Sequence, residues 1–125
     1  WERQIAAIQA MAKRYQASIL IDSTGVGDPI YERLRALKLN VKGYQFTANS
    51  KEALINNLAI AIEQQTIRLM DIDKQEHELM AYEYEQLPSG RLRMNAPTGQ
   101  HDDIVIADAL VVWQLQHRRE LVVTL

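Results

Sequence analysis

The stretch Ala17-Ser-Ile-Leu-Ile-Asp-Ser-Thr-Gly-Val-Gly-Asp-Pro29 decides the fold that this sequence predicts. Its first five residues form an apolar run that lacks the period of a helix, so they predict a short buried strand. Gly25 and Gly27 predict a turn with positive φ angles and a close backbone approach to Asp22. Asp28-Pro29 then supplies an N-cap and a first helical residue. A strand, a turn and a helix in this order indicate an α/β unit.

Helices and strands alternate along the rest of the chain. Asn49 with Glu52 resembles a capping box, and Leu87-Pro-Ser-Gly90 suits a type I turn between two strands. The last helix is expected to open at His101 or Asp102. The expected elements are helices over residues 1–15, 29–37, 49–62, 73–81 and 102–116, strands over 17–21, 41–46 and 66–70, and a hairpin of 82–86 and 91–95. No repeat or linker interrupts them, so we predict one α/β domain over residues 1–125.

The composition excludes several classes of protein. Lys and Arg number 14 and Asp and Glu 16, and the resulting net charge of −2 excludes a protein held to nucleic acid by bulk charge alone. The absence of Cys excludes disulfide scaffolds, thiolate zinc sites and Cys nucleophiles. With 47% apolar and 24% charged residues the chain is globular in composition. No apolar stretch is long enough to span a bilayer, so we expect no membrane partner.

Basic residues concentrate in one segment despite the near-neutral total. Between Tyr31 and Lys51 the only acid is Glu32, whereas the basic residues are Arg33, Arg35, Lys38, Lys42 and Lys51. Such an asymmetry can mark a surface that faces a polyanion. The alternative is a set of solvated faces with no binding role.

Asp22 is the first candidate for chemistry. It ends the apolar strand, and open α/β sheets keep their sites at the carboxyl ends of strands. The alternative is that Asp22 forms an Asx-turn or caps the next helix.

His101-Asp102-Asp103 is the second candidate. Adjacent carboxylates repel each other, and a divalent cation compensates them better than a helix N-terminus, which contributes under about 1 kcal/mol. Carboxylate oxygens suit Mg²⁺ or Mn²⁺. The alternative is that Asp102 caps the helix and Asp103 is a first-turn acid. Asp108 lies on another face of the helix, so we expect it to be either a buried polar group with a structural partner or a group that acts on the site from a distance.

Three motifs in this order resemble the nuclease domain of the terminase large subunit of tailed phages. They are Ile21-Asp-Ser-Thr-Gly-Val-Gly-Asp-Pro29, Phe46-Thr-Ala-Asn-Ser-Lys51 and Ala96-Pro-Thr-Gly-Gln-His-Asp-Asp-Ile-Val105, with Tyr82-Glu-Tyr84 before the hairpin. The resemblance implies an RNase H-like mixed sheet flanked by helices. It also implies that the first strands of that fold, with one metal-binding carboxylate, precede Trp1. The chain alone is therefore expected to be a nearly inactive fragment that can self-associate through an open strand edge.

The same resemblance implies a metal-dependent endonuclease that cleaves concatemeric viral DNA during genome packaging. Two Mg²⁺ or Mn²⁺ ions are expected in the complete domain, with Asp22 and Asp103 as ligands and Asp102 as a neighbouring ligand. The residues expected to hold the DNA backbone are Arg33, Arg35, Lys38, Lys42 and Lys51. Sequence-independent contacts of this kind suit a packaging nuclease.

The expected partners are double-stranded DNA, an ATPase domain in the same longer chain, the small terminase subunit and the portal, and the expected location is the host cytoplasm. One alternative is another RNase H-like nuclease, such as a junction resolvase or a transposase core. Another is a non-catalytic α/β interaction module. A small nucleotide-binding domain is the least favoured, because Ile30 stands where a dinucleotide fingerprint has its third glycine.

Overall fold

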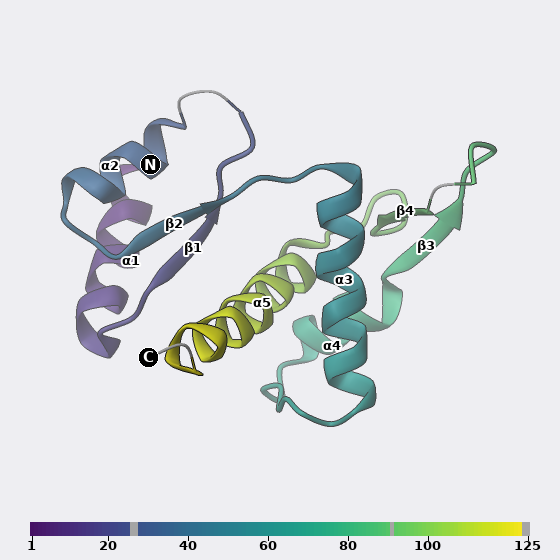
Figure 1. Cartoon of the computed structure of the whole chain (residues 1–125). Coiled ribbons are helices and arrows are strands. Elements are labelled where there is room, and N and C mark those ends of the chain that lie inside the picture. Colours follow the sequence, from purple (N-terminus) through teal and green to yellow (C-terminus); the bar gives the residue numbers. More distant parts are fainter. Residues whose placement is uncertain (26–27, 91, 124–125) are drawn as a thin grey trace. The chain divides into compact units, whose positions relative to one another are not determined.

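The computed structural model describes residues 1–25, 28–90 and 92–123. The chain folds into two compact units, Trp1–Phe46 and Thr47–Leu125, and each is described by itself. Figure 1 shows the elements of each unit. In chain order they are α1 (Glu2–Tyr15), β1 (Ile19–Asp22), α2 (Pro29–Ala36), β2 (Val41–Tyr44), α3 (Ala48–Glu63), α4 (Asp73–Ala81), β3 (Glu83–Gln86), β4 (Leu92–Asn95) and α5 (Asp103–Val123).

The first unit contains the predicted strand, turn and helix. β1 and β2 pair in parallel, with Ile19 opposite Val41 and Asp22 opposite Tyr44. α2 connects the two strands and begins as predicted, because the Asp28 carboxylate accepts a hydrogen bond from the backbone N–H of Ile30 at 2.9 Å. The unit thus places the carboxyl ends of both strands at the same edge of this small sheet.

Two glycines shape the region around the end of β1. Gly25 has φ = 125°, which confirms the predicted positive φ at this position, whereas Gly27 lies outside the described residues. In β2, a Cβ atom added at Gly43 would lie 2.7 Å from the Cβ of Ser23. A side chain at Gly43 would therefore force the backbone after Asp22 to move.

The second unit is built around α3 and α5, which pack against each other (Figure 1). The apolar residues buried in these two helices form most of its core: Leu54, Ile55, Leu58 and Ala61 from α3, and Val105, Ala109, Leu110 and Val112 from α5. This burial is the main source of stability that the unit offers, since burying one Leu or Val side chain contributes about 1.5–3 kcal/mol.

The predicted capping box of α3 was wrong in its residues. Thr47, not Asn49, is the N-cap, and its hydroxyl oxygen accepts a hydrogen bond from the backbone N–H of Ser50 at 3.0 Å. The Ser50 hydroxyl oxygen in turn accepts from the backbone N–H of Thr47 at 2.8 Å. A serine hydroxyl thus fills the place where the prediction had a Glu carboxylate.

The hairpin of β3 and β4 is antiparallel as predicted, with Glu83 opposite Asn95. The N–H of Gly90 donates to the carbonyl oxygen of Leu87 at 2.9 Å, which closes the predicted turn. The strand predicted over residues 66–70 was wrong: these residues form neither helix nor strand, and Met70 is 70% exposed. An apolar run that is not buried has no driving force to form a strand.

α5 is longer than predicted. It begins at Asp103, directly after the expected start at His101 or Asp102, and continues to Val123 instead of ending near Gln116. No Gly or Pro follows Gln116 to stop it. Within the described ranges, no helix has the length and apolar character that crossing a bilayer requires.

Candidate metal and DNA site

Asp22 is exposed at the carboxyl end of β1, where the sequence placed it. Its Oδ1 accepts a hydrogen bond from the backbone N–H of Thr24 at 2.8 Å, so the Asx-turn that was the alternative interpretation is present. The Thr24 hydroxyl oxygen accepts from the N–H of Phe46 at 2.8 Å and ties this turn to the residues after β2. The Asx-turn occupies only one oxygen of Asp22 and therefore leaves the other available as a ligand.

Asp102 and Asp103 stand at the start of α5 with different surroundings. The side chain of Asp102 is 29% exposed, and Asp103 is exposed. Within the part of the chain that the structure describes, no hydrogen bond or ion pair involves the Asp103 carboxylate. Asp103 is thus the more accessible of the two carboxylates to a cation from solvent.

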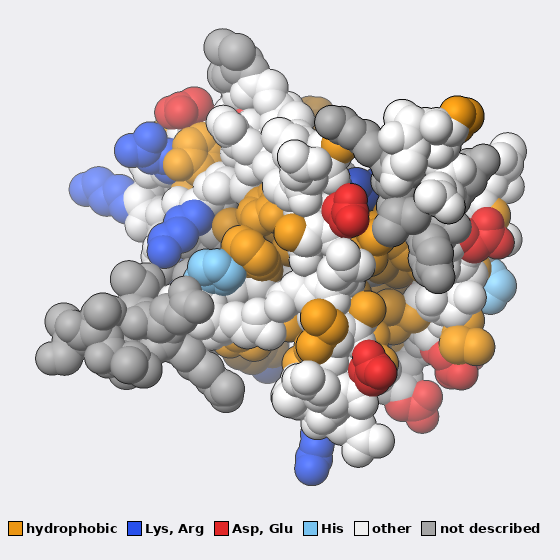
Figure 2. Space-filling model, turned by 45° about the vertical axis from the view of Figure 1, so that its right-hand side comes forward, with side chains coloured by type: hydrophobic (Ala, Val, Ile, Leu, Met, Phe, Trp, Pro, Cys, Tyr) orange, Lys and Arg blue, Asp and Glu red, His pale blue; other side chains and the backbone are white. Residues whose placement is uncertain are grey.

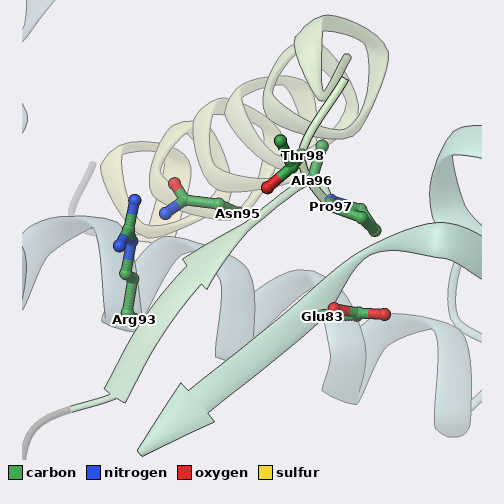
Figure 3. Close-up of a pocket in the computed structure, with 6 residues that line it drawn as sticks. All are labelled: Glu83, Arg93, Asn95, Ala96, Pro97 and Thr98. Carbon is green, nitrogen blue, oxygen red and sulfur yellow. The ribbon is translucent and has the colours of Figure 1, made fainter. Parts of the chain in front are cut away.

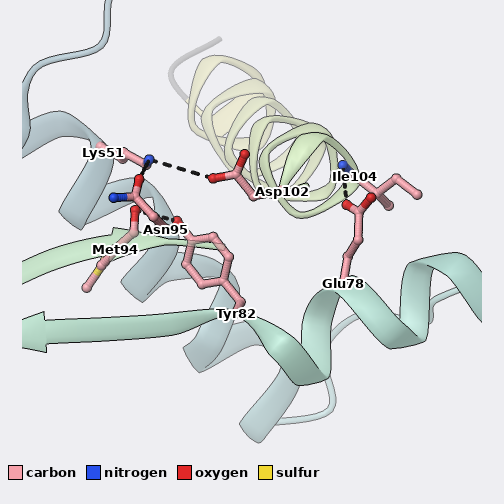
Figure 4. Close-up of polar contacts among 7 residues, drawn as sticks. All are labelled: Lys51, Glu78, Tyr82, Met94, Asn95, Asp102 and Ile104. Carbon is pink, nitrogen blue, oxygen red and sulfur yellow. Dashed lines mark hydrogen bonds and ion pairs between the residues drawn. The ribbon is translucent and has the colours of Figure 1, made fainter. Parts of the chain in front are cut away.

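Lys51 connects Asp102 to the hairpin, as Figure 4 shows. Its Nζ donates a hydrogen bond to Asn95 Oδ1 at 2.9 Å and lies 3.9 Å from Asp102 Oδ2. Lys51 comes from the first turn of α3, Asn95 ends β4 and Asp102 directly precedes α5. The sequence predicted Lys51 and Asp102 as site residues, and the structure brings these two together.

Glu78 of α4 approaches α5 from another side (Figure 4). It is 5% exposed, and its Oε2 accepts a hydrogen bond from the backbone N–H of Ile104 at 2.8 Å. The sequence predicted a helix over residues 73–81 and gave no sign of this residue's role. A further, partly buried contact joins the same helices: the amide nitrogen of Gln75 donates to both carboxylate oxygens of Asp108, at 3.0 and 2.8 Å. Of the two roles expected for Asp108, the structural partner is thus the one that the structure confirms.

Tyr82 lies close to this group of polar residues. Its hydroxyl donates to the carbonyl oxygen of Met94 at 3.0 Å (Figure 4). Burial, together with the smaller effect of the negative charge of Asp102, raises the pKa of Tyr82 to about 12. Burial and the charge of Asp102 thus both disfavour ionisation of the Tyr82 hydroxyl, which would place a second negative charge beside the start of α5.

We expect an alkaline spectrophotometric titration of the chain to contain a tyrosine transition with a pKa of about 12 that is absent from Tyr82→Phe. Because the phenol of the unfolded chain ionises near the ordinary tyrosine pKa of 10.0, the stability that neutral Tyr82 supplies is present below that pH. It is lost as the pH rises toward about 12. An unchanged titration curve in Tyr82→Phe would contradict the assignment.

A pocket of about 360 Å³ lies beside the hairpin. Figure 3 shows its lining residues, which are Glu83, Arg93, Asn95, Ala96, Pro97 and Thr98. Asn95 belongs both to this pocket and to the contact with Lys51, so the pocket adjoins the polar group at the start of α5.

The basic residues predicted to hold DNA are divided between the two units. Arg33, Arg35, Lys38 and Lys42 are exposed in the first unit, where Arg33 lies 3.9 Å from the exposed Glu2. Lys51 lies in the second unit. Figure 2 shows several Lys and Arg side chains at the surface. Binding of DNA by these residues stays a prediction.

The donor set fits a hard divalent cation in its chemistry, because Asp22, Asp102 and Asp103 offer only oxygen atoms. Among the described residues, no cluster of three or more His, Asp or Glu side chains suits a metal. Asp22 lies in the first unit and Asp103 in the second, so their convergence on one metal stays a prediction. Sequence reasoning missed Glu78 and Asn95 as neighbours of this region and quoted Tyr82 only as part of Tyr82-Glu-Tyr84, because the positions of all three side chains depend on packing.

No family model matches the chain. The chain is 34% identical over 118 residues to the terminase large subunit of Thermus phage G20c, and equally to that of Thermus virus P23-45. In both cases the match covers 93% of this chain and 24% of the relative. The chain thus spans about a quarter of the length of these curated relatives.

Solved structures are similar over the same region. The large terminase nuclease of phage G20c with bound magnesium matches with a TM-score of 0.80 and 33% identity, over 89% of this chain and 60% of that one. The large terminase nuclease domain of Thermus phage P74-26 matches with a TM-score of 0.78 and 29% identity, over 88% and 57%. Over most of its length, the chain is therefore similar in sequence and in structure to the nuclease domain of phage terminase large subunits, and its fold is RNase H-like.

Proposed function

We propose that residues 1–125 are part of the nuclease domain of a longer terminase large subunit, a divalent-metal-dependent endonuclease that cleaves concatemeric viral DNA during packaging. The observation that carries this proposal is the position of Asp22 at the end of β1 and of Asp103 at the start of α5, in a chain homologous to a nuclease solved with bound magnesium. The same G20c nuclease was also solved with cobalt and with zinc, which supports divalent-metal use without fixing the metal.

Hydrolysis of a phosphodiester needs a deprotonated water and a stabilised leaving oxygen. A bound divalent cation supplies Lewis acidity for both needs. We assign the holding of this cation to Asp22 and Asp103, with Asp102 as their neighbour. Lys51 offsets part of the negative charge of Asp102 from 3.9 Å, which reduces the repulsion between the two adjacent carboxylates before a cation binds.

The remaining roles concern the DNA. Arg33, Arg35, Lys38 and Lys42 are exposed cations that can neutralise phosphates without reading bases. The proposed partners are double-stranded DNA, an ATPase domain in the same longer chain, the small terminase subunit and the portal. The proposed location is the cytoplasm of the host.

Lys51→Ala in the full-length protein should weaken DNA binding equally for unrelated sequences and reduce the salt slope of log K by about one unit, because one phosphate contact is lost. Lys74→Ala is the matched control, since Lys74 is an exposed lysine of α4 in an acidic segment. Filter binding or fluorescence anisotropy over a range of salt concentrations measures both variants. An unchanged slope in Lys51→Ala, or a loss confined to one DNA sequence, would contradict backbone binding by Lys51.

A plasmid assay tests the proposed function itself. Full-length protein that carries this sequence should nick and linearise supercoiled plasmid in Mn²⁺ or Mg²⁺ and lose that activity in excess chelator. A non-catalytic module would show neither cleavage nor metal dependence. A junction resolvase would cleave branched DNA in preference to plasmid, which would favour the alternative within the RNase H-like nucleases.

A further inference from the structure

Glu78 is a buried carboxylate to which the proposed nuclease mechanism gives no role so far. It is a carboxylate with only 5% exposure, and its second oxygen, Oε1, is buried with no hydrogen-bond partner among the described residues. Burying a carboxylate costs free energy unless something compensates the charge. The contact that compensates it is the backbone N–H of Ile104, at 2.8 Å from Oε2. The first turn of α5 is electropositive and adds to this compensation.

This contact stands where the alternative interpretation of the sequence had Asp102 as the cap of the helix. Asp102 directly precedes α5, where a carboxylate ordinarily caps the free N–H groups of the first turn. In the described part of the chain the Asp102 carboxylate accepts no hydrogen bond from a backbone N–H, and its Oδ2 instead lies 3.9 Å from Lys51. Glu78, from a different helix, therefore supplies the acceptor for the α5 N-terminus (Figure 4).

The peptide group that Glu78 holds is the one that joins Asp103 to Ile104. Its N–H is fixed by Glu78, and its other side is the backbone carbonyl of Asp103. A restraint on this peptide limits the backbone angles of Asp103 and hence the direction in which the Asp103 carboxylate points. On the opposite side, Lys51 restrains the preceding residue, Asp102.

We propose that Glu78 is a positioning residue that preorganises Asp103 to bind a divalent cation. The proposal rests on the proposed function, because Asp103 is a metal ligand only under it. Partners that orient metal ligands typically contribute about 10- to 100-fold in metal affinity or activity. Glu78 touches neither the metal nor the DNA in this role and acts only through Asp103.

The test measures Mn²⁺ binding by three variants of the full-length protein, Glu78→Ala, Glu78→Asp and Glu78→Gln. The electron paramagnetic resonance signal of the free ion gives the fraction of Mn²⁺ that is bound. Glu78→Ala should raise the dissociation constant for Mn²⁺ about 10- to 100-fold. Glu78→Asp should do the same, because its shorter side chain cannot reach the N–H of Ile104. Glu78→Gln should retain most of the affinity, since its amide oxygen can accept that hydrogen bond.

Gln75→Ala is the matched control. Gln75 is 8% exposed on the same helix and joins α4 to α5 at Asp108, five residues beyond Asp103. Its loss should lower stability without changing Mn²⁺ affinity, so a merely structural role of α4 is separated from positioning. If Glu78→Ala does not fold, Glu78→Asp and Glu78→Gln still test the proposal. It requires Glu78→Asp to bind Mn²⁺ more weakly than Glu78→Gln, and equal affinities would overturn it.

Plasmid cleavage separates failure of this inference from failure of the proposed function. In full-length protein, Glu78→Ala should raise the Mn²⁺ concentration for half-maximal cleavage more than it lowers the rate at saturating Mn²⁺. If Asp103→Asn abolishes Mn²⁺ binding and cleavage while Glu78→Ala behaves like Gln75→Ala, the inference is overturned and the nuclease stands. If wild-type protein shows no Mn²⁺ binding that depends on Asp103, both are overturned.

Discussion

Asp22→Asn and Asp103→Asn should each reduce Mn²⁺-dependent cleavage of supercoiled plasmid by at least about a hundredfold in the full-length protein. The amide is nearly isosteric with the carboxylate but carries no charge, so each variant removes a ligand charge and little packing. A bound cation stabilises the transition state by several kcal/mol, and every 1.36 kcal/mol corresponds to a factor of about ten in rate.

Asp73→Asn is the control for both variants. Asp73 is also an exposed carboxylate and is the first residue of α4, as Asp103 is of α5. Its activity should equal that of the wild type. Full activity in Asp22→Asn would show that Asp22 serves only the Asx-turn with Thr24. Full activity in Asp103→Asn would show that Asp103 is only an acidic residue of the first turn of α5.

Leu54→Ala should lower the free energy of unfolding of the second unit by about 2–5 kcal/mol. Leu54 is completely buried in α3, the helix that packs against α5. The substitution removes buried apolar area and leaves a cavity between groups that can close it only in part. Because domains are stable by about 5–15 kcal/mol in total, this is a large share.

Urea unfolding followed by circular dichroism measures this loss. Ile60→Ala is the matched control, since Ile60 lies on the same helix and is 50% exposed. It should cost much less than Leu54→Ala. Equal losses in the two variants would contradict the assignment of the core to the α3 face that carries Leu54.

The local elements were predictable where one short segment contains all the determinants. Asp28-Pro29 specifies both the cap and the first residue of α2, and Leu87-Pro-Ser-Gly90 specifies the hairpin turn. The carboxylate at the end of β1 was predictable for the same reason, because an apolar run followed by Asp22 needs no information from elsewhere in the chain.

The errors arose where distant residues decide the outcome. The run over residues 66–70 resembles a strand, but it found no partner strand among the described residues and stayed outside any sheet. Glu78 resembles the other acids of α4, and only the packing of that helix against α5 brings its carboxylate to the N–H of Ile104. The pairing of Lys51 with Asp102 likewise joins residues that are far apart in the sequence.

A crystal structure of the complete nuclease domain grown or soaked with Mn²⁺ shows whether Asp22 and Asp103 bind the same cation. We expect an anomalous density peak within about 2.0–2.4 Å of carboxylate oxygens from both Asp22 and Asp103, the range of hard-cation contacts. The proposed metal site would be contradicted if the carboxylates of Asp22 and Asp103 pointed to opposite faces of the domain and Mn²⁺ bound to neither.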